Sequence, residues 1–219
     1  FDENPGETLV SVNGLDIDEL AYLVCRGGWP RAVLQEDREV ALDQALNYYE
    51  SVVKSDISRA DGINRNEQRA RLLMRSYARN QGAQVSNGAL KADMSANDAS
   101  TLDEDTVLSY VNALKKIFVV EDLPAWNPNL RSKTVVRTSD TRYFVDPSIA
   151  AAALGIYPKD LINDLNTFGL MFETMCIRDL RIYADALGGQ LYHYRDKSCL
   201  ECDAVIHLNN GDYGLIEIK

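Results

Sequence analysis

Helical hydrophobic spacing runs through most of this chain, and strand-like runs are confined to a few short segments. Apolar residues recur at helical spacing within 15–30, 37–55, 65–82, 85–94, 102–118, 146–155 and 160–187. Runs typical of strands occupy 119–126, 133–145, 190–196, 201–208 and 213–219. Long helical portions with segregated groups of strands predict an α+β fold.

Several residues have the chemistry of helix ends. Short polar side chains cap the first turn by accepting backbone N–H bonds, and glycine ends a helix because it tolerates positive φ. The predicted caps are Asp16 or Asp18, Gly27, Ser86, Asp146 and Gly155. These positions divide the helical portion into separate, short helices.

Composition excludes several protein classes. With 46% hydrophobic and 26% charged residues in 219, the chain is expected to be globular. No apolar run approaches the length of a membrane span, and no secretory signal is visible, so we expect no membrane partner. The four cysteines are expected to be free thiols in the cytoplasm. Phe1 and a final strand that stops at Lys219 lead us to expect a piece of a longer protein.

The net charge of −10 is unevenly distributed and suggests a domain division. An acidic surface repels phosphate, which argues against tight non-specific nucleic-acid binding by the whole chain. Only the middle third is mildly basic. We therefore expect a helical segment at 1–64, a second module at 65–145, and an α/β domain at 146–219. The sequence does not fix the oligomeric state.

The final hairpin turns at Asn209-Asn210-Gly211, and two registers fit it. A two-residue turn would place Asp203 opposite Ile218. A three-residue loop, with Gly211 in the left-handed region, would place Asp203 opposite Glu217. We favour the second register because it gathers the charged residues on one face, whereas a one-residue slip inverts every side chain.

In the favoured register, three charged residues near the end of the chain can form a metal site. Two opposed carboxylates repel each other, but Mg²⁺ accepts one or two carboxylates and keeps several waters. Asp203 and Glu217 are the predicted metal ligands, and Lys219 lies beside them to stabilise a phosphate oxyanion. An ordinary solvated strand face is the alternative.

Glu173 is a third acid of interest because it is the only charge in FGLMFETMCI, residues 168–177. A buried glutamate needs a partner. A metal-binding carboxylate cluster would supply one, and so would Arg195 or a cap-type hydrogen bond.

Three predicted helices followed by a strand pair give the middle module the order of a winged helix. The helix at 102–118 begins with acidic residues that would repel DNA phosphates, so Arg131, Lys133, Arg137 and Arg142 on the wing are the better candidates for nucleic-acid contact. Docking of a protein partner is the alternative role for this module.

Several sequence blocks in their joint order resemble a family of bacterial ATPases. The blocks are GGWP, SDISRADGI, RYFVDPSIAAAALG, FGLMFE, YHYRD, ECDAV and IEIK. In that family an AAA-type ATPase core precedes a domain of unknown function with an end that resembles PD-(D/E)xK nucleases. The resemblance implies that residues 1 to about 45 continue an ATPase lid and that ATP binds to a core upstream.

The resemblance also implies roles for individual residues. Asp203 and Glu217 would hold Mg²⁺, Lys219 would be the catalytic lysine, and Glu173 would be a supporting acid. Gly28 and Pro30 match a G-x-P segment that approaches the nucleotide in related ATPases. The nuclease-like domain would be incomplete at its C-terminus. The implied substrate is DNA or RNA; a non-catalytic adaptor that binds a protein or nucleic acid is the alternative.

Overall fold

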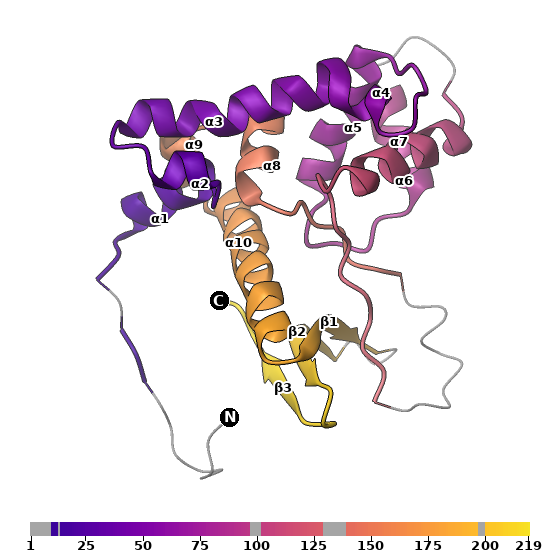
Figure 1. Ribbon diagram of the computed structural model, residues 1–219. Coiled ribbons are helices and arrows are strands. Elements are labelled where there is room, and N and C mark those ends of the chain that lie inside the picture. The colour runs from indigo at the N-terminus through magenta and orange to yellow at the C-terminus, as the bar shows by residue number, and fades with distance from the viewer. Residues whose placement is uncertain (1–9, 13, 97–101, 129–138, 197–199) are drawn as a thin grey trace.

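The computed structural model describes residues 10–12, 14–96, 102–128, 139–196 and 200–219. Helices make up most of this part, and a small antiparallel sheet lies at one end, so the chain has an α+β fold (Figure 1). In chain order the elements are α1 (Ile17–Arg26), α2 (Pro30–Val33), α3 (Arg38–Ser51), the π-helical turn η1 (Val52–Asp56), α4 (Ile57–Arg59), α5 (Glu67–Arg79), α6 (Asn87–Ser95), α7 (Glu104–Lys116), α8 (Pro147–Leu154), α9 (Pro158–Asn163), α10 (Leu165–Ala186), β1 (Gly189–Arg195), β2 (Glu201–Leu208) and β3 (Tyr213–Ile216).

The predicted helix ends are confirmed. The Asp16 side chain accepts a hydrogen bond from Glu19 N at 2.8 Å. Ser86 and Asp146 cap α6 and α8 in the same way. Gly27 and Gly155 end α1 and α8 with φ of 75° and 71°. Local side-chain chemistry therefore sets the limits of these helices.

The prediction of one helix over 160–187 is wrong. The structure has two helices there, α9 and α10, separated at Asp164, where φ is −130° and ψ is 82°. The Asp164 carboxylate accepts hydrogen bonds from Thr167 N at 3.1 Å and Thr167 Oγ1 at 2.6 Å. This residue starts a new helix because its side chain satisfies backbone donors that the preceding helix would otherwise have used.

The strands predicted in the middle third are shorter and less regular than expected. Residues 119–123 lie antiparallel to 141–145, joined by isolated bridges at Val120–Phe144 and Leu123–Thr141. Pro124 follows Leu123 and has no N–H to continue the pairing. The predicted run at 133–138 lies outside the described residues.

One hydrophobic core joins helices from all three predicted domains. It contains Ala21 of α1, Leu73 of α5, Val111 of α7 and Ile149 of α8, each at most 1% exposed. Helix α8 lies in the middle of this core, with its first five residues all buried. The division at 64 and 145 stays a prediction, since buried side chains on both sides of each limit pack together.

A second, smaller core lies between α10 and the sheet. Ile177 and Ala184 of α10 pack with Leu191 of β1 and with Ala204 and Ile206 of β2. Figure 1 shows α10 extending from the helical part of the molecule to the sheet, in which β2 lies between β1 and β3. Helix α10 thus links the two cores.

None of the helices in the described part of the chain combines the length and apolarity needed to cross a membrane. Cys25, Cys176 and Cys202 are free thiols.

Candidate functional site

The hairpin between β2 and β3 has a three-residue loop, as the favoured register predicts. Leu208 N donates to Asp212 O at 2.8 Å, and Gly211 N donates to Leu208 O at 3.0 Å. Gly211 has φ of 96°, a value that glycine adopts without steric cost. The two-residue turn is therefore excluded.

This register aligns an acid of β2 with an acid directly after β3. The ladder ends with the pair Ala204 and Ile216, and continuing the same count places Asp203 opposite Glu217. Ile218 N donates to Asp203 Oδ2 at 2.7 Å, which keeps the end of the chain beside β2. Ile216 and Ile218 pack against the smaller core, whereas Glu217 and Lys219 are exposed.

The pairing of β2 with β1 is irregular beside Asp203. The flanking pairs are Tyr192 with Val205 and Tyr194 with Cys202. Two residues of β2, Asp203 and Ala204, therefore face the single residue His193 of β1. Two residues on one strand opposite one residue on its partner define a β-bulge, which bends the strand and changes the direction of its side chains. Asp203 thus lies where the alternation of the strand is interrupted.

Glu173 lies on α10 and is half-buried. Its Oε1 accepts a hydrogen bond from the hydroxyl of Tyr143. Burial raises the pKa of Glu173, the Tyr143 hydrogen bond opposes this, and the negative charges of Asp203 and Glu201 raise it further. The structure therefore brings Glu173 into the electrostatic range of Asp203.

The partner of Glu173 differs from all three that its sequence context predicts. We expected a metal cluster, Arg195 or a helix cap, and the partner is the hydroxyl of Tyr143, 30 residues earlier in the chain. Arg195 instead pairs with Glu201, with 3.8 Å between Nη1 and Oε2. No local pattern joins Tyr143 to Glu173, so periodicity could not have found this contact.

The carboxylates of Asp203 and Glu217, called the acidic site below, suit a hard cation, but they do not form a complete set of metal ligands. In the part of the chain that the structure describes, no three His, Cys, Asp or Glu side chains are grouped closely enough to hold a metal. Within the same residues, Glu217 and Lys219 make no ion pair, and one oxygen of Asp203 accepts no hydrogen bond. A pair of carboxylates with free oxygens fits Mg²⁺, which keeps several of its waters.

Gly28 and Pro30 belong to a structural junction. Gly28 N donates to Asp146 Oδ2 at 2.8 Å, and Pro30 is the first residue of α2. Asp146 is 4% exposed and also pairs with Arg178 of α10 at 2.7 Å. A Cβ on Gly27 would lie 2.4 Å from Asp146 Oδ1, so this position has no room for a side chain. The GGWP segment thus fastens α1 and α2 to α8 and α10.

The basic residues predicted for nucleic-acid contact are mostly outside the described residues. Arg131, Lys133 and Arg137 are in that group. Arg142 is described, and its guanidinium donates to Asp122 Oδ2 at 3.0 Å, Val85 O at 3.1 Å and Asn87 Oδ1 at 3.0 Å. With these three acceptors Arg142 ties α6 to the segment 119–123.

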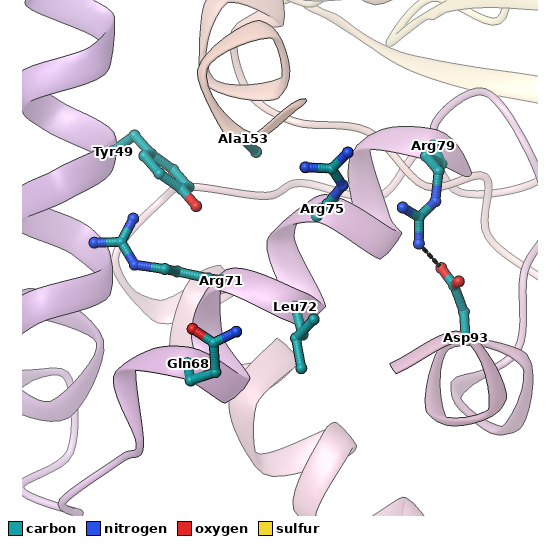
Figure 2. Close-up of a pocket in the computed structure, with 8 residues that line it drawn as sticks. All are labelled: Tyr49, Gln68, Arg71, Leu72, Arg75, Arg79, Asp93 and Ala153. Atoms are coloured by element: carbon teal, nitrogen blue, oxygen red, sulfur yellow. Dashed lines mark hydrogen bonds and ion pairs between the residues drawn. The ribbon is translucent and has the colours of Figure 1, made fainter. Parts of the chain in front are cut away.

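A pocket that the sequence analysis did not predict lies between α3, α5 and α8 (Figure 2). Its volume is about 540 Å³. The polar residues that line it are Tyr49, Gln68, Arg71, Arg75, Arg79 and Asp93. Leu72 and Ala153 complete the lining. The available signal was the spacing of the three arginines, which recur every fourth residue and therefore share one helix face.

The comparison with protein families divides the chain into two regions. Residues 17–160 match the family described as a domain of unknown function (DUF8612). The chain belongs to this family. Residues 168–219 match a second family, described as a domain of unknown function (DUF4143). No curated protein and no solved structure matches the chain.

The two candidate sites fall in different matched regions. The arginine-lined pocket lies within the DUF8612 match, and Glu173, Asp203, Glu217 and Lys219 lie within the DUF4143 match. Tyr143, in the first region, reaches Glu173 in the second. Residues from both matched regions therefore meet at Glu173.

Proposed function

We propose that this chain is the C-terminal accessory region of a bacterial AAA-type ATPase, with a nuclease-like, Mg²⁺-dependent phosphodiesterase site that acts on nucleic acid. The DUF4143 match supports the ATPase context, because that family is commonly associated with the C-terminal regions of AAA ATPases. In this proposal ATP binds to an AAA-type core outside these 219 residues, and the accessory region responds to it.

The register of the final hairpin is the observation that carries the proposal. It opposes Asp203 to Glu217, and two opposed carboxylates destabilise a sheet unless a cation lies between them. These two side chains would hold Mg²⁺. When bound there, the ion would lower the pKa of a coordinated water and polarise a phosphoryl oxygen.

The other residues of the site would position and stabilise charge. The Lys219 ammonium, two residues after Glu217, would stabilise the negative charge that develops on the phosphate when water attacks phosphorus. Glu173 holds its proton more readily than an ordinary glutamate because burial raises its pKa. Held by the Tyr143 hydroxyl, it would position Asp203 rather than take part in bond breaking.

The middle of the chain would guide the substrate. Helices α5, α6 and α7 pack on one another, and the paired segments 119–123 and 141–145 follow them, in the order of a winged helix. In this proposal Arg131, Lys133 and Arg137 contact phosphates of DNA or RNA from the wing. Arg142 would hold the segment 141–145 in place rather than contact the substrate, since its guanidinium is already hydrogen-bonded.

Cleavage by the full-length protein tests the proposal. With DNA or RNA and Mg²⁺, the wild-type protein should cleave, and Asp203→Asn should remove the Mg²⁺-dependent activity. Lys219→Ala should slow cleavage roughly 10²- to 10³-fold, the usual cost of losing one group that stabilises an oxyanion. Asp43→Asn, which neutralises an exposed carboxylate on α3, is the matched control and should cleave normally. Wild-type cleavage that both site variants retain would disprove the assignment.

One observation favours a second candidate, a non-catalytic adaptor region that docks a protein or nucleic acid. One oxygen of Asp203 already accepts a hydrogen bond from Ile218 N, which gives this carboxylate a structural role in holding the end of the sheet. Calorimetric titration with Mg²⁺ or Mn²⁺ distinguishes the two candidates. Binding heat that disappears in Asp203→Asn supports the phosphodiesterase, and absence of heat in the wild-type protein supports the adaptor.

A further inference from the structure

The arginine-lined pocket in the DUF8612 region has an arrangement of charge that secondary structure and core packing do not require. Arg71, Arg75 and Arg79 follow one another at intervals of four along α5. Like charges at this spacing destabilise a helix. A cost of this kind is offset when acids or a bound anion neutralise the row.

Acids neutralise the first arginine. Arg71 donates from Nη1 to Glu50 Oε1 at 2.7 Å and from Nη2 to Glu50 Oε2 at 2.8 Å, and also pairs with Glu67 at 2.7 Å. The guanidinium lies 5.5 Å from the centre of the Tyr49 ring. Arg71 is thus held rigidly at one side of the pocket and has little capacity left for a ligand.

The last arginine is partly neutralised. Arg79 Nη2 lies 2.5 Å from Asp93 Oδ2 on α6, and both side chains are substantially exposed, at 41% and 31%. Exposed pairs of this kind are weak. Arg79 can therefore turn toward another anion in the pocket at small cost.

Among the described residues the middle arginine, Arg75, makes no ion pair and no hydrogen bond, and its charge acts on the hydroxyl of Tyr49. Figure 2 shows its guanidinium turned toward Ala153 of α8, while the hydroxyl of Tyr49 points from α3 into the same pocket. Gln68, one turn along α5 from Arg71, adds an amide to the lining. A free guanidinium, a hydroxyl and an amide are together the donors that recognise an oxyanion.

We propose that this pocket binds a small phosphorylated molecule, with its phosphate on Arg75. A volume of about 540 Å³ is within the range of pockets for small-molecule ligands, which is about 300–1,000 Å³, and exceeds the needs of a bare ion. The fork of a guanidinium matches two phosphate oxygens at once. The ligand is a compact anion with a terminal phosphate.

The surroundings disfavour an extended polyanion as the occupant. Glu50, Glu67 and Asp93 lie around the arginines, and the whole chain has a net charge of −10. A strand of nucleic acid would bring several phosphates close to these carboxylates. A compact ligand can place one phosphate on Arg75 and avoid them.

Calorimetric titration of the full chain with inorganic pyrophosphate tests the proposal. We expect saturable binding to the wild-type protein, weakened at least tenfold in Arg75→Gln. Arg75→Lys, which keeps the charge but loses the fork, should bind with intermediate affinity. Arg31→Gln is the matched control, because Arg31 is an exposed arginine on α2 outside the pocket, and it should bind like the wild type.

A second variant tests the role of the surrounding acids. Asp93→Asn removes the carboxylate that pairs with Arg79, so pyrophosphate should bind severalfold more tightly. Unfolding temperatures equal to that of the wild type will show that Arg75→Gln is folded, as expected for an exposed residue.

Three results would overturn the proposal. They are absence of saturable pyrophosphate binding, equal binding by wild type and Arg75→Gln, and binding of a single-stranded oligonucleotide through Arg75 without any binding of pyrophosphate. None of these results bears on cleavage at Asp203, since the pocket and the acidic site share no residue.

Discussion

Replacing Asp146 with alanine should destabilise the protein more than any other single change at a helix end. The carboxylate accepts four hydrogen bonds, from Gly28 N, Ser148 N, Ser148 Oγ and Arg178 Nη1, at distances between 2.6 and 2.9 Å. Its removal leaves two backbone N–H groups and Nη1 of Arg178 without this acceptor, while Nε of Arg178 keeps its bond to Asp179.

The magnitude follows from two separate losses. Breaking a buried ion pair by removing one partner costs about 3–5 kcal/mol. Arg178 is 20% exposed and also pairs with Asp179, so we take the lower end, about 3 kcal/mol. Loss of the N-cap of α8 adds about 1 kcal/mol. The total of roughly 4 kcal/mol corresponds to a fall in Tm of about 8–16 °C for a chain of this size.

Thermal and urea unfolding, followed by circular dichroism, would measure this loss. Asp16→Ala is the control because Asp16 also caps a helix but is exposed and accepts one N–H bond at 2.8 Å. It should cost about 1 kcal/mol. If Asp146→Ala were no more destabilising than Asp16→Ala, the junction between the first helices and α8 would contribute nothing beyond an ordinary cap, and the reasoning would be refuted.

Two further predictions concern other positions. Because burial raises the pKa of Glu173, its carboxyl favours the folded state below the ordinary glutamate pKa and loses this contribution as pH rises through the folded pKa. Glu173→Gln should therefore gain stability relative to the wild type on going from pH about 4 to pH about 7. Urea unfolding at several pH values would measure the difference in stability, and a constant or declining difference would contradict the prediction. Gly27→Ala should cost more than Gly62→Ala, although the two glycines have similar φ, because a Cβ on Gly27 would lie 2.4 Å from atoms of Asp146 and Ser148, whereas a Cβ on Gly62 meets nothing within 4 Å. We expect about 1–2 kcal/mol of backbone strain at Gly62 and a larger loss at Gly27; equal losses in thermal unfolding would rule out the steric contribution.

Predictions from the sequence succeeded where the determinants are local. Asp146 capping a helix and Gly211 allowing a three-residue loop are properties of a few neighbouring residues. The backbone register that aligns Asp203 with Glu217 follows from that loop, so one local feature was enough to predict it.

Predictions failed or were incomplete where distant residues decide. The junction of Gly28 with Asp146 joins positions 118 residues apart, and the Tyr143 hydroxyl reaches Glu173 from another element. The break at Asp164 was missed because the apolar spacing continues through it, and only the hydrogen bonds to Thr167 reveal a new start. The bulge beside Asp203 depends on how β2 pairs with β1, which hydrophobic alternation does not specify.

The contact between Tyr143 and Glu173 crosses from one matched region to the other. Recombination that joined either region to a foreign counterpart would leave the Glu173 carboxylate without its hydroxyl donor, or the Tyr143 hydroxyl without its acceptor. A hybrid of this kind should therefore be less stable around Glu173 than the intact chain.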